Sequence, residues 1–315
     1  MSLGKLAPRE TLLGRCEAPL GDPLVVSEVH SRIDGLREWT QMKSIEFTPE
    51  TDEQGLANGL TVNVRSLEGE TWEQGDASVQ FRSDWRTSRP DDIGETGLNI
   101  ADGTVLVTKF TTPRPFMDHL AEQRKVVNLL TLVSGQPVHF RQHKVSAESI
   151  VDRSAGGTIL SHPRVQLISA DTVRGYSQPM LSKDDLNRFL AHLPEVGAAG
   201  MMRWAGQHDR WKRYILPAVG VLRRKGAYAE DVIISMSMSI EAAGQIIGER
   251  DGEEATHNRE RPTTATYVYR CLNVLGVKWG MWLRPMSPLP ELSPRPTTTS
   301  SISIGENSQN LMSLT

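Results

Sequence analysis

Residues 104–138 read TVLVTKFTTPRPFMDHLAEQRKVVNLLTLVSGQPV and join a strand pattern to a helix pattern. Thr104–Phe110 alternates valine with threonine and leucine in a β-branched run that is typical of a strand. Pro115 fits the first turn of a helix, and apolar residues then recur every three to four positions until Gly135 and Pro137. We therefore expect an amphipathic helix of about 19 residues, or about five turns. It forms the centre of the first domain, with a sheet folded against it.

Short strand-like runs fill most of the chain up to residue 180, separated by clusters of Gly, Asp, Asn and Pro. The expected strands are Leu24–Val29, Lys43–Phe47, Leu60–Val64, Ser78–Phe81, Gly97–Ile100, Thr104–Phe110, Val138–His143, Gly157–Leu160 and Arg164–Ser169. Their spacing predicts a sandwich or a curled sheet. Between the first two strands, residues 31–39 (SRIDGLREW) indicate a short helical turn with Trp39 in the core.

Helical patterns dominate from residue 182 to residue 279. Ser182 resembles a helix N-cap, and we expect Pro194 to end the helix that begins there. A second helix is expected over residues 200–226, where Pro217 predicts a kink.

Tyr228–Ile247 predicts the strongest helix of this half, because one stripe of apolar residues runs along it. The stripe consists of Val232, Met236, Ile240, Ala243 and Ile247. The serines between these residues are expected on other faces of the helix. A last helix should follow Pro262 and Thr263, and the short connections imply a small bundle.

The sequence thus predicts an α+β chain in three parts. Residues 1–180 form a β-rich, sandwich-like domain around one central amphipathic helix, and residues 181–282 form an all-α bundle. Residues 283–315 contain no aromatic residue and five prolines, so we expect a disordered tail.

The composition is that of a globular chain of 315 residues with a net charge of −3. This net charge is slightly negative, so the chain as a whole does not attract RNA electrostatically. RNA binding therefore requires a local basic surface. Cys16 and Cys271 match no disulfide or metal spacing, which favours the reducing cytoplasm. No apolar run approaches the roughly 20 residues of a membrane helix. We expect a cytoplasmic protein with no membrane contact.

His208 is a candidate for RNA contact, because it lies between Trp204 and Trp211 in a basic segment. The two tryptophans are seven residues apart and fall on the same helix face, as core residues of a bundle do. We favour core packing for this pair.

His139 and His143 fall on one face of an expected strand, with Arg141 between them. As a metal pair they lack a third ligand nearby, and we favour ordinary residues on the surface of a sheet. The sequence shows no Gly-rich phosphate loop, nucleophile elbow or zinc cluster, so we expect no metal and no cofactor. Glu241 adjoins the apolar stripe of the strongest helix, where its carboxylate would orient a cationic partner or lie partly exposed to water.

Four segments resemble a known family. RIDGLREW at residues 32–39 and FMDHLAEQRKVVNLLTLVSGQPV at residues 116–138 resemble the N-terminal domain of ApeA-type proteins. SIEAAGQIIGER at residues 239–250 and RPTTATYVYRCLNVLGV at residues 261–277 resemble the helical domain of the same proteins, which is of the HEPN (higher eukaryotes and prokaryotes nucleotide-binding) class.

The resemblance implies a bacterial anti-phage ribonuclease that acts as a homodimer through its helical domain, with RNA as substrate and a phage-derived trigger. Such domains cleave RNA without a metal, through an Arg-x4–6-His motif from each subunit. Histidine moves protons at the 2′-OH, and arginine stabilises charge on the phosphate. The chemistry is sound, because RNA carries its own nucleophile.

Three segments fit the motif literally, from Arg114 to His119, from Arg203 to His208 and from Arg250 to His257. A pattern this short also arises by chance. The family places the motif after Trp282, where this sequence has no histidine. The family motif is therefore absent from its place, and Glu241, Arg250 and His257 remain as candidate catalytic residues.

The missing motif suggests a frameshift. If codons are chosen freely for Pro296–Thr315, a shifted frame encodes DHHIKHFDRGEFPEPDESY, whose IKHFDRGEFP resembles the end of such helical domains. This predicts a frameshifted C-terminus and impaired cleavage. The alternatives are a genuine disordered tail, a non-catalytic sensing and dimerisation module that binds a phage or host ligand, and a carbohydrate-binding sandwich fused to an unrelated bundle.

Overall fold

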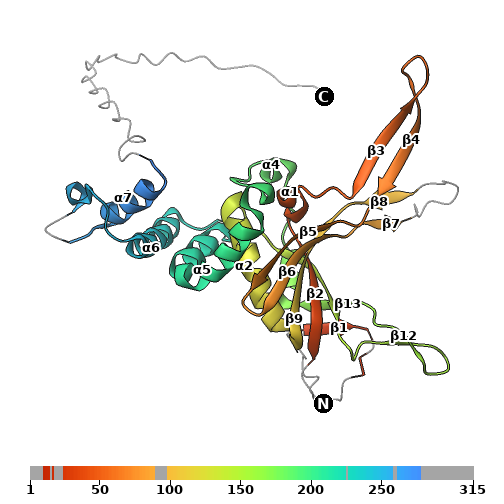
Figure 1. Cartoon of the computed structure of the whole chain (residues 1–315). Coiled ribbons are helices and arrows are strands. Elements are labelled where there is room, and N and C mark those ends of the chain that lie inside the picture. The colour runs from red at the N-terminus through yellow and green to blue at the C-terminus, as the bar shows by residue number, and fades with distance from the viewer. Residues whose placement is uncertain are drawn as a thin grey trace, which may run out of the picture. The chain divides into compact units, whose positions relative to one another are not determined.

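The fold is α+β, as predicted, in a computed structural model of the chain (Figure 1). The structure describes residues 10–14, 16–17, 24–88, 98–224, 226–257 and 261–277. The predicted tail, and with it the frameshift hypothesis, lies outside these residues. The contacts discussed below lie within Met1–Cys271, one of two compact units of the chain. Among the described residues, no helix combines the length and the apolar character needed to cross a membrane.

Seven antiparallel strands form one sheet, in the order β1-β13-β10-β2-β9-β6-β5. Their bounds are β1 (Glu10–Leu13), β13 (Val165–Ser169), β10 (Phe140–Ser146), β2 (Val25–Ile33), β9 (Thr104–Pro115), β6 (Ala77–Ser83) and β5 (Glu68–Gln74). Three two-stranded ribbons pair β3 (Ile45–Thr51) with β4 (Ala57–Val64), β7 (Arg86–Ser88) with β8 (Asn99–Ala101), and β11 (Asp152–Arg153) with β12 (Ile159–Ser161). Among the described elements, the layer that packs on the centre of the sheet is a helix rather than a second large sheet.

That helix is α2 (Phe116–Ser134), whose 19 residues match the predicted length. It packs against β2 and β9 and carries much of the buried core. Gly135 ends it with a φ of 65°, a left-handed conformation that glycine adopts without strain. Pro115 occupies the N-cap, one position earlier than predicted. The predicted core residue Trp39 is fully buried in α1 (Leu36–Thr40).

Strand β10 carries a bulge that redirects its side chains. The register with β2 shifts between Phe140 and Gln142. A bulge adds one residue to a strand and changes which side chains face the core. Phe140 and His143 are consequently both buried, and His143 has no exposed surface. The prediction that His139 and His143 are surface residues of one sheet face is therefore wrong for His143.

His143 belongs to a buried polar network that joins three elements. Its Nδ1 lies 2.7 Å from the hydroxyl of Ser31 on β2, and that hydroxyl donates to Gln123 Oε1 on α2 at 2.5 Å. Gln123 donates in turn to the backbone carbonyl of Val29 at 3.1 Å. The rings of Phe116 and Phe140 pack against the imidazole at 5.1 and 5.0 Å. This apolar enclosure favours the neutral form of the ring.

The helical half consists of one long helix and several shorter ones. The bounds are α3 (Ala170–Tyr176), α4 (Lys183–Leu186), α5 (Leu193–Leu222), α6 (Ala229–Ile247) and α7 (Thr264–Val274), with a 3-10 turn η1 (Glu253–Thr256) before α7. Ser182 caps α4 as predicted, but α4 lasts only one turn. Pro194 lies in the first turn of α5, so the prediction that it ends a helix is wrong. Gly197 interrupts α5 with non-helical angles.

Helix α6 has the predicted bounds to within one residue, and Ala243 of the predicted apolar stripe is buried, but a serine shares the buried face. Ser239 is buried and donates to the carbonyl of Tyr214 at 2.9 Å, against the prediction that the serines lie on other faces. Met236 of the predicted stripe is exposed, and so are Ile233, Ile234 and Met238, which lie outside the stripe. Small residues bring α6 close to its neighbours, and the apolar side chains of its first half are left uncovered among the described residues.

The buried histidine makes stability depend on pH. Burial lowers the pKa of His143 to about 4, from about 6.5 in an unfolded chain. The unfolded state therefore binds a proton first, and stability that is complete above pH 6.5 is lost as the pH falls toward 4. We expect His143→Gln to remove about 2 kcal/mol of the loss in unfolding free energy between pH 7 and pH 5.

Urea unfolding of the full chain at both pH values measures this difference. The same substitution at the exposed His162 is the matched control and should leave the pH dependence of the wild type. An equal pH dependence for His143→Gln and the wild type would contradict the prediction.

Candidate functional site

Two of the three sequence-predicted catalytic residues meet at one carboxylate. The backbone N–H of Arg250 donates to Glu253 Oε2 at 2.9 Å, and His257 Nε2 lies 3.3 Å from Glu253 Oε1. The 3-10 turn η1 produces this arrangement, because it folds the segment between them around Glu253. Arg250 and His257, the two ends of the Arg-x6-His segment, therefore contact the same carboxylate. Arg250 does so through its backbone N–H and not through its guanidinium.

A buried ion pair holds this carboxylate in place. Arg270 on α7 donates to Glu253 through Nε at 2.7 Å and through Nη2 at 2.6 Å, a bidentate pairing. Hydrogen bonding from Arg270 lowers the pKa of Glu253 to about 2. Glu253 therefore stays ionised at neutral pH and orients His257.

The third predicted residue, Glu241, shares no hydrogen bond with Glu253 in the described part of the chain. Its Oε1 accepts a hydrogen bond from the hydroxyl of Thr264 at 2.8 Å, which ties α6 to the start of α7. Close packing of these helices also depends on Gly244, because a Cβ there would collide with Tyr267. The observed role of Glu241 is to join two helices.

The other two literal motif segments have structural roles in the described fold. His119 is fully buried on α2, with its ring nitrogens each 3.1 Å from a backbone carbonyl oxygen, of Val26 and of Thr108. His208 is buried beside Trp204, and its Nε2 lies 3.3 Å from the amide nitrogen of Asn128. Trp204 is half-buried and donates to a backbone carbonyl of α2, so this pair fixes α5 to α2.

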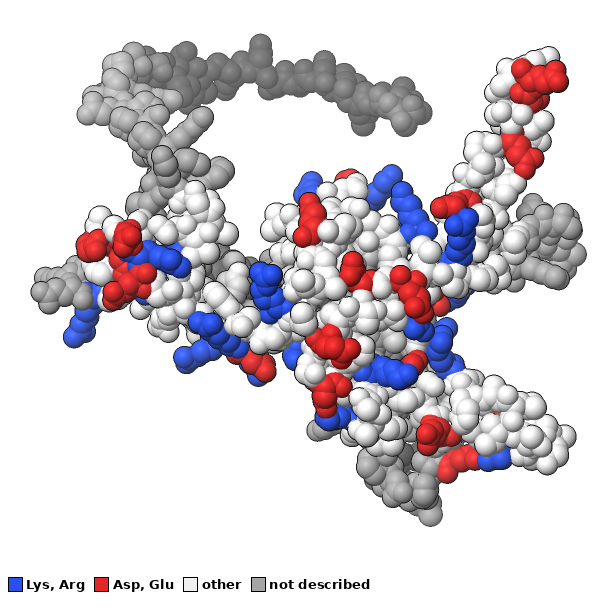
Figure 2. Space-filling model, viewed as in Figure 1, with Lys and Arg blue, Asp and Glu red and all other residues white. Residues whose placement is uncertain are grey.

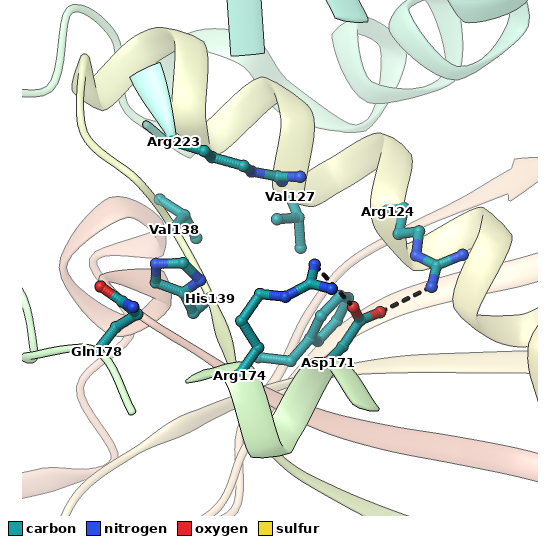
Figure 3. Close-up of a pocket in the computed structure, with 9 residues that line it drawn as sticks. Arg124, Val127, Val138, His139, Asp171, Arg174, Gln178 and Arg223 are labelled. Atoms are coloured by element: carbon teal, nitrogen blue, oxygen red, sulfur yellow. Dashed lines mark hydrogen bonds and ion pairs between the residues drawn. The ribbon is translucent and has the colours of Figure 1, made fainter. Parts of the chain in front are cut away.

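A pocket of about 270 Å³ lies elsewhere, between α2, α3 and the end of α5 (Figure 3). Three arginines and one aspartate line it, together with an apolar wall. The lining residues are Arg124, Val127, Val138, His139, Phe140, Asp171, Arg174, Gln178 and Arg223. Figure 3 shows Arg124, Arg174 and Arg223 arriving from three different helical segments around Asp171.

The floor of this pocket is built by close contact of α3 with β10. Gly175 permits it, because a Cβ there would collide with the carbonyl oxygen of Phe140. Arg141 holds the end of α3 from beneath, since its guanidinium donates to the carbonyls of Gly175 and Gln178. The same guanidinium forms a bidentate pair with Asp34 at 2.6 and 2.8 Å. The hydrogen bonds of Arg141 therefore tie the end of α3 to Asp34 at the base of the pocket.

The charged groups of the pocket are unequal in number. Asp171 pairs with Arg124 at 2.7 Å and lies 3.8 Å from Arg174. Arg223 Nη2 donates to Asn128 Oδ1 at 3.3 Å. Loss of water lowers the pKa of the Arg223 guanidinium, Asp171 raises it, and Arg124 and Arg174 lower it again. Among the described residues that line the pocket, three guanidinium groups and one carboxylate leave two positive charges in excess.

Sequence reasoning missed this pocket, although it noticed His139, which lines it. The charged residues come from α2, α3 and the end of α5, with gaps of tens of residues between them. No short sequence motif contains them, so the only sequence feature that pointed to the pocket was Arg124, which lies beside the apolar stripe of α2.

The family model described as ApeA N-terminal domain 1 matches residues 21–204, more than half of the chain. The matched range contains six of the seven sheet strands, α2, α3 and the first part of α5. No curated protein and no solved structure matches the chain. The chain therefore belongs to the ApeA N-terminal domain 1 family, and with it to the ApeA-like proteins of anti-phage defence.

Proposed function

We propose that the helical half of this defence protein is a HEPN-type ribonuclease module that cleaves RNA without a metal. The observation that carries the proposal is the convergence of Arg250 and His257 on Glu253, within a helical segment that follows an ApeA N-terminal domain. His257 is the proton-transferring group, oriented by Glu253. The exposed side chain of Arg250 is the cation for the phosphate.

Cleavage by this sequence is impaired. The resemblance places the Arg-x4–6-His motif after Trp282, and the sequence as written has no histidine there. Arg250 and His257 then provide the groups that remain, without the pair that such domains bring together at a dimer interface. A frameshift that removed the motif accounts for this, and sequencing the codons for Gly276–Thr315 tests it.

A metal-free cleavage assay tests the proposal. Purified full chain in EDTA should cut labelled single-stranded RNA slowly, and His257→Ala should lower that rate about 100-fold, because it removes the acid–base group. His162→Ala is the matched control at an exposed histidine. Cleavage that survives His257→Ala unchanged would exclude this site, and no cleavage above a protein-free control would favour the non-catalytic function below.

We propose further that the chain is a homodimer through the helical half. Ile233, Ile234 and Met238 leave an uncovered apolar surface on the first half of α6, on the described part of the chain. Exposed apolar groups of this kind mark association surfaces, because burial of apolar area is favourable.

A charge on this surface should break the dimer. Wild-type chain at micromolar concentration is expected to sediment at twice its chain mass, and Ile234→Glu at the chain mass, because a carboxylate is costly to bury. Gln207→Glu introduces the same charge at an exposed position on α5 and should leave the dimer intact. A monomeric wild type, or a dimeric Ile234→Glu variant, would contradict the proposal.

A second candidate function is a non-catalytic module that senses a phage or host protein. The ribbon of β3 and β4 favours it, because three successive opposed pairs on one of its faces are apolar: Ile45 with Val64, Phe47 with Val62, and Pro49 with Leu60. Phe47 and Leu60 are exposed. An isolated two-stranded ribbon is marginally stable in water, so a partner that covers this face would stabilise it.

The chemistry of the ribbon specifies its partner. Residues 45–64 contain four acidic residues and no lysine or arginine, and Figure 2 shows acidic side chains along the ribbon. The partner should therefore offer an apolar surface with a basic rim.

Phage challenge of cells that express the chain tests this second function. We expect the wild type to reduce plaque numbers and Phe47→Ser to lose that protection, because the substitution removes the largest side chain of the apolar face. Thr48→Ser changes the opposite, polar face and should protect as the wild type does. Equal protection by both variants would exclude the ribbon as the sensing surface.

A further inference from the structure

The arginine-lined pocket has a charge imbalance that calls for an anion. Arg124, Arg174 and Arg223 surround one carboxylate, Asp171, in a partly enclosed cavity. Repulsion between like charges is stronger in such a cavity than in water. Arg223 is the least compensated of the three, because its hydrogen-bond partner among the described residues is the neutral amide of Asn128. A bound group with about two negative charges would balance the cavity.

We propose that this pocket binds a small phosphate monoester, with the nucleoside monophosphates as the chemical class that fits best. A phosphate monoester carries about −1.5 to −2 charges at pH 7, which matches the two positive charges in excess. Guanidinium groups pair with phosphate through parallel hydrogen bonds. Arg174 and Arg223, which approach from opposite sides in Figure 3, contact the phosphate, and Arg124 supports it from the third side.

The rest of the pocket fits the other end of such a ligand. Val127, Val138 and Phe140 are almost fully buried and provide an apolar wall. Gln178 at the rim offers both a donor and an acceptor, which suits the edge of a base or a sugar hydroxyl. A volume of about 270 Å³ lies just below the usual range for ligand sites of about 300 Å³ or more. The volume of the pocket therefore suits a small ligand such as one mononucleotide.

The ligand would also join two parts of the molecule. Arg124 and Arg174 lie within the ApeA N-terminal domain match, whereas Arg223 caps the end of α5 beyond it. A phosphate held by both sides fixes the end of α5 against α2 and α3, at the point where the chain turns toward α6. This inference is independent of RNA cleavage and of dimer formation.

Calorimetric titration of the full chain with adenosine 5′-monophosphate tests the proposal, with inorganic phosphate and adenosine as comparison probes. The monophosphate should bind, phosphate more weakly, and adenosine not measurably. Arg174→Gln should weaken binding about tenfold or more by removing a charge-assisted hydrogen bond. Because Arg174 is largely exposed, this variant should keep its fold. Arg210→Gln, at an exposed arginine of α5 outside the pocket, is the matched control.

A second variant, in which the affinity should rise, distinguishes an effect on this site from a general loss of structure. Asp171→Asn removes the one carboxylate of the pocket, raises its positive excess from two to three, and frees Arg124 for the ligand. It should bind the monophosphate more tightly than the wild type, and Arg223→Lys should retain part of the affinity. Equal binding of adenosine and its monophosphate, unchanged affinity in Arg174→Gln, or weaker binding in a folded Asp171→Asn would overturn the proposal.

Discussion

The N-terminal fold depends on how α2 places its polar side chains inside the core. His119 and Gln123 are fully buried on the face that meets β2 and β9. Each reaches backbone carbonyls of the sheet, His119 those of Val26 and Thr108, and Gln123 that of Val29. A buried polar group without a partner costs about 1–3 kcal/mol, so only one position of α2 along the sheet avoids this loss. Apolar contacts alone are non-directional and would not fix that position.

This constraint explains what could be predicted from the sequence and what could not. The bounds of α2 were predictable, because an apolar period and Gly135 define them locally. The role of Pro194 was not predictable, since proline is common both just after the end of a helix and in the first turn of the next one. In this chain α4 ends after one turn, so Pro194 falls in the first turn of α5. The burial of His143 depends on a bulge in β10, which changes the face of a side chain without leaving a clear trace in the hydrophobic pattern.

The helical half shows a second feature that the period of apolar residues does not predict, namely which element packs against each helix. The apolar stripe of α6 was identified correctly as a pattern, but a pattern does not state which neighbour covers it. The closest approach of α6 to other helices occurs at Ser239 and Gly244, where small side chains let the backbones come together. The candidate residues Arg250 and His257 meet at Glu253 for a similar reason, because the bidentate pair of Glu253 with Arg270 is formed between segments that the sequence separates.

The pocket could not be predicted from the sequence, because its residues come from separate elements and form a site only after the fold is complete. Arg124 is set by α2, Arg174 by the close contact of Gly175 with β10, and Arg223 by the end of α5. Asn128 lies at the centre of this arrangement, since its amide contacts both His208 in the middle of α5 and Arg223 at the C-cap of α5. Any ligand that draws Arg223 toward Asp171 must therefore act on the same amide that holds α5 to the N-terminal domain. The charge balance of the pocket and the attachment of the helical half are in this way parts of one hydrogen-bonded network.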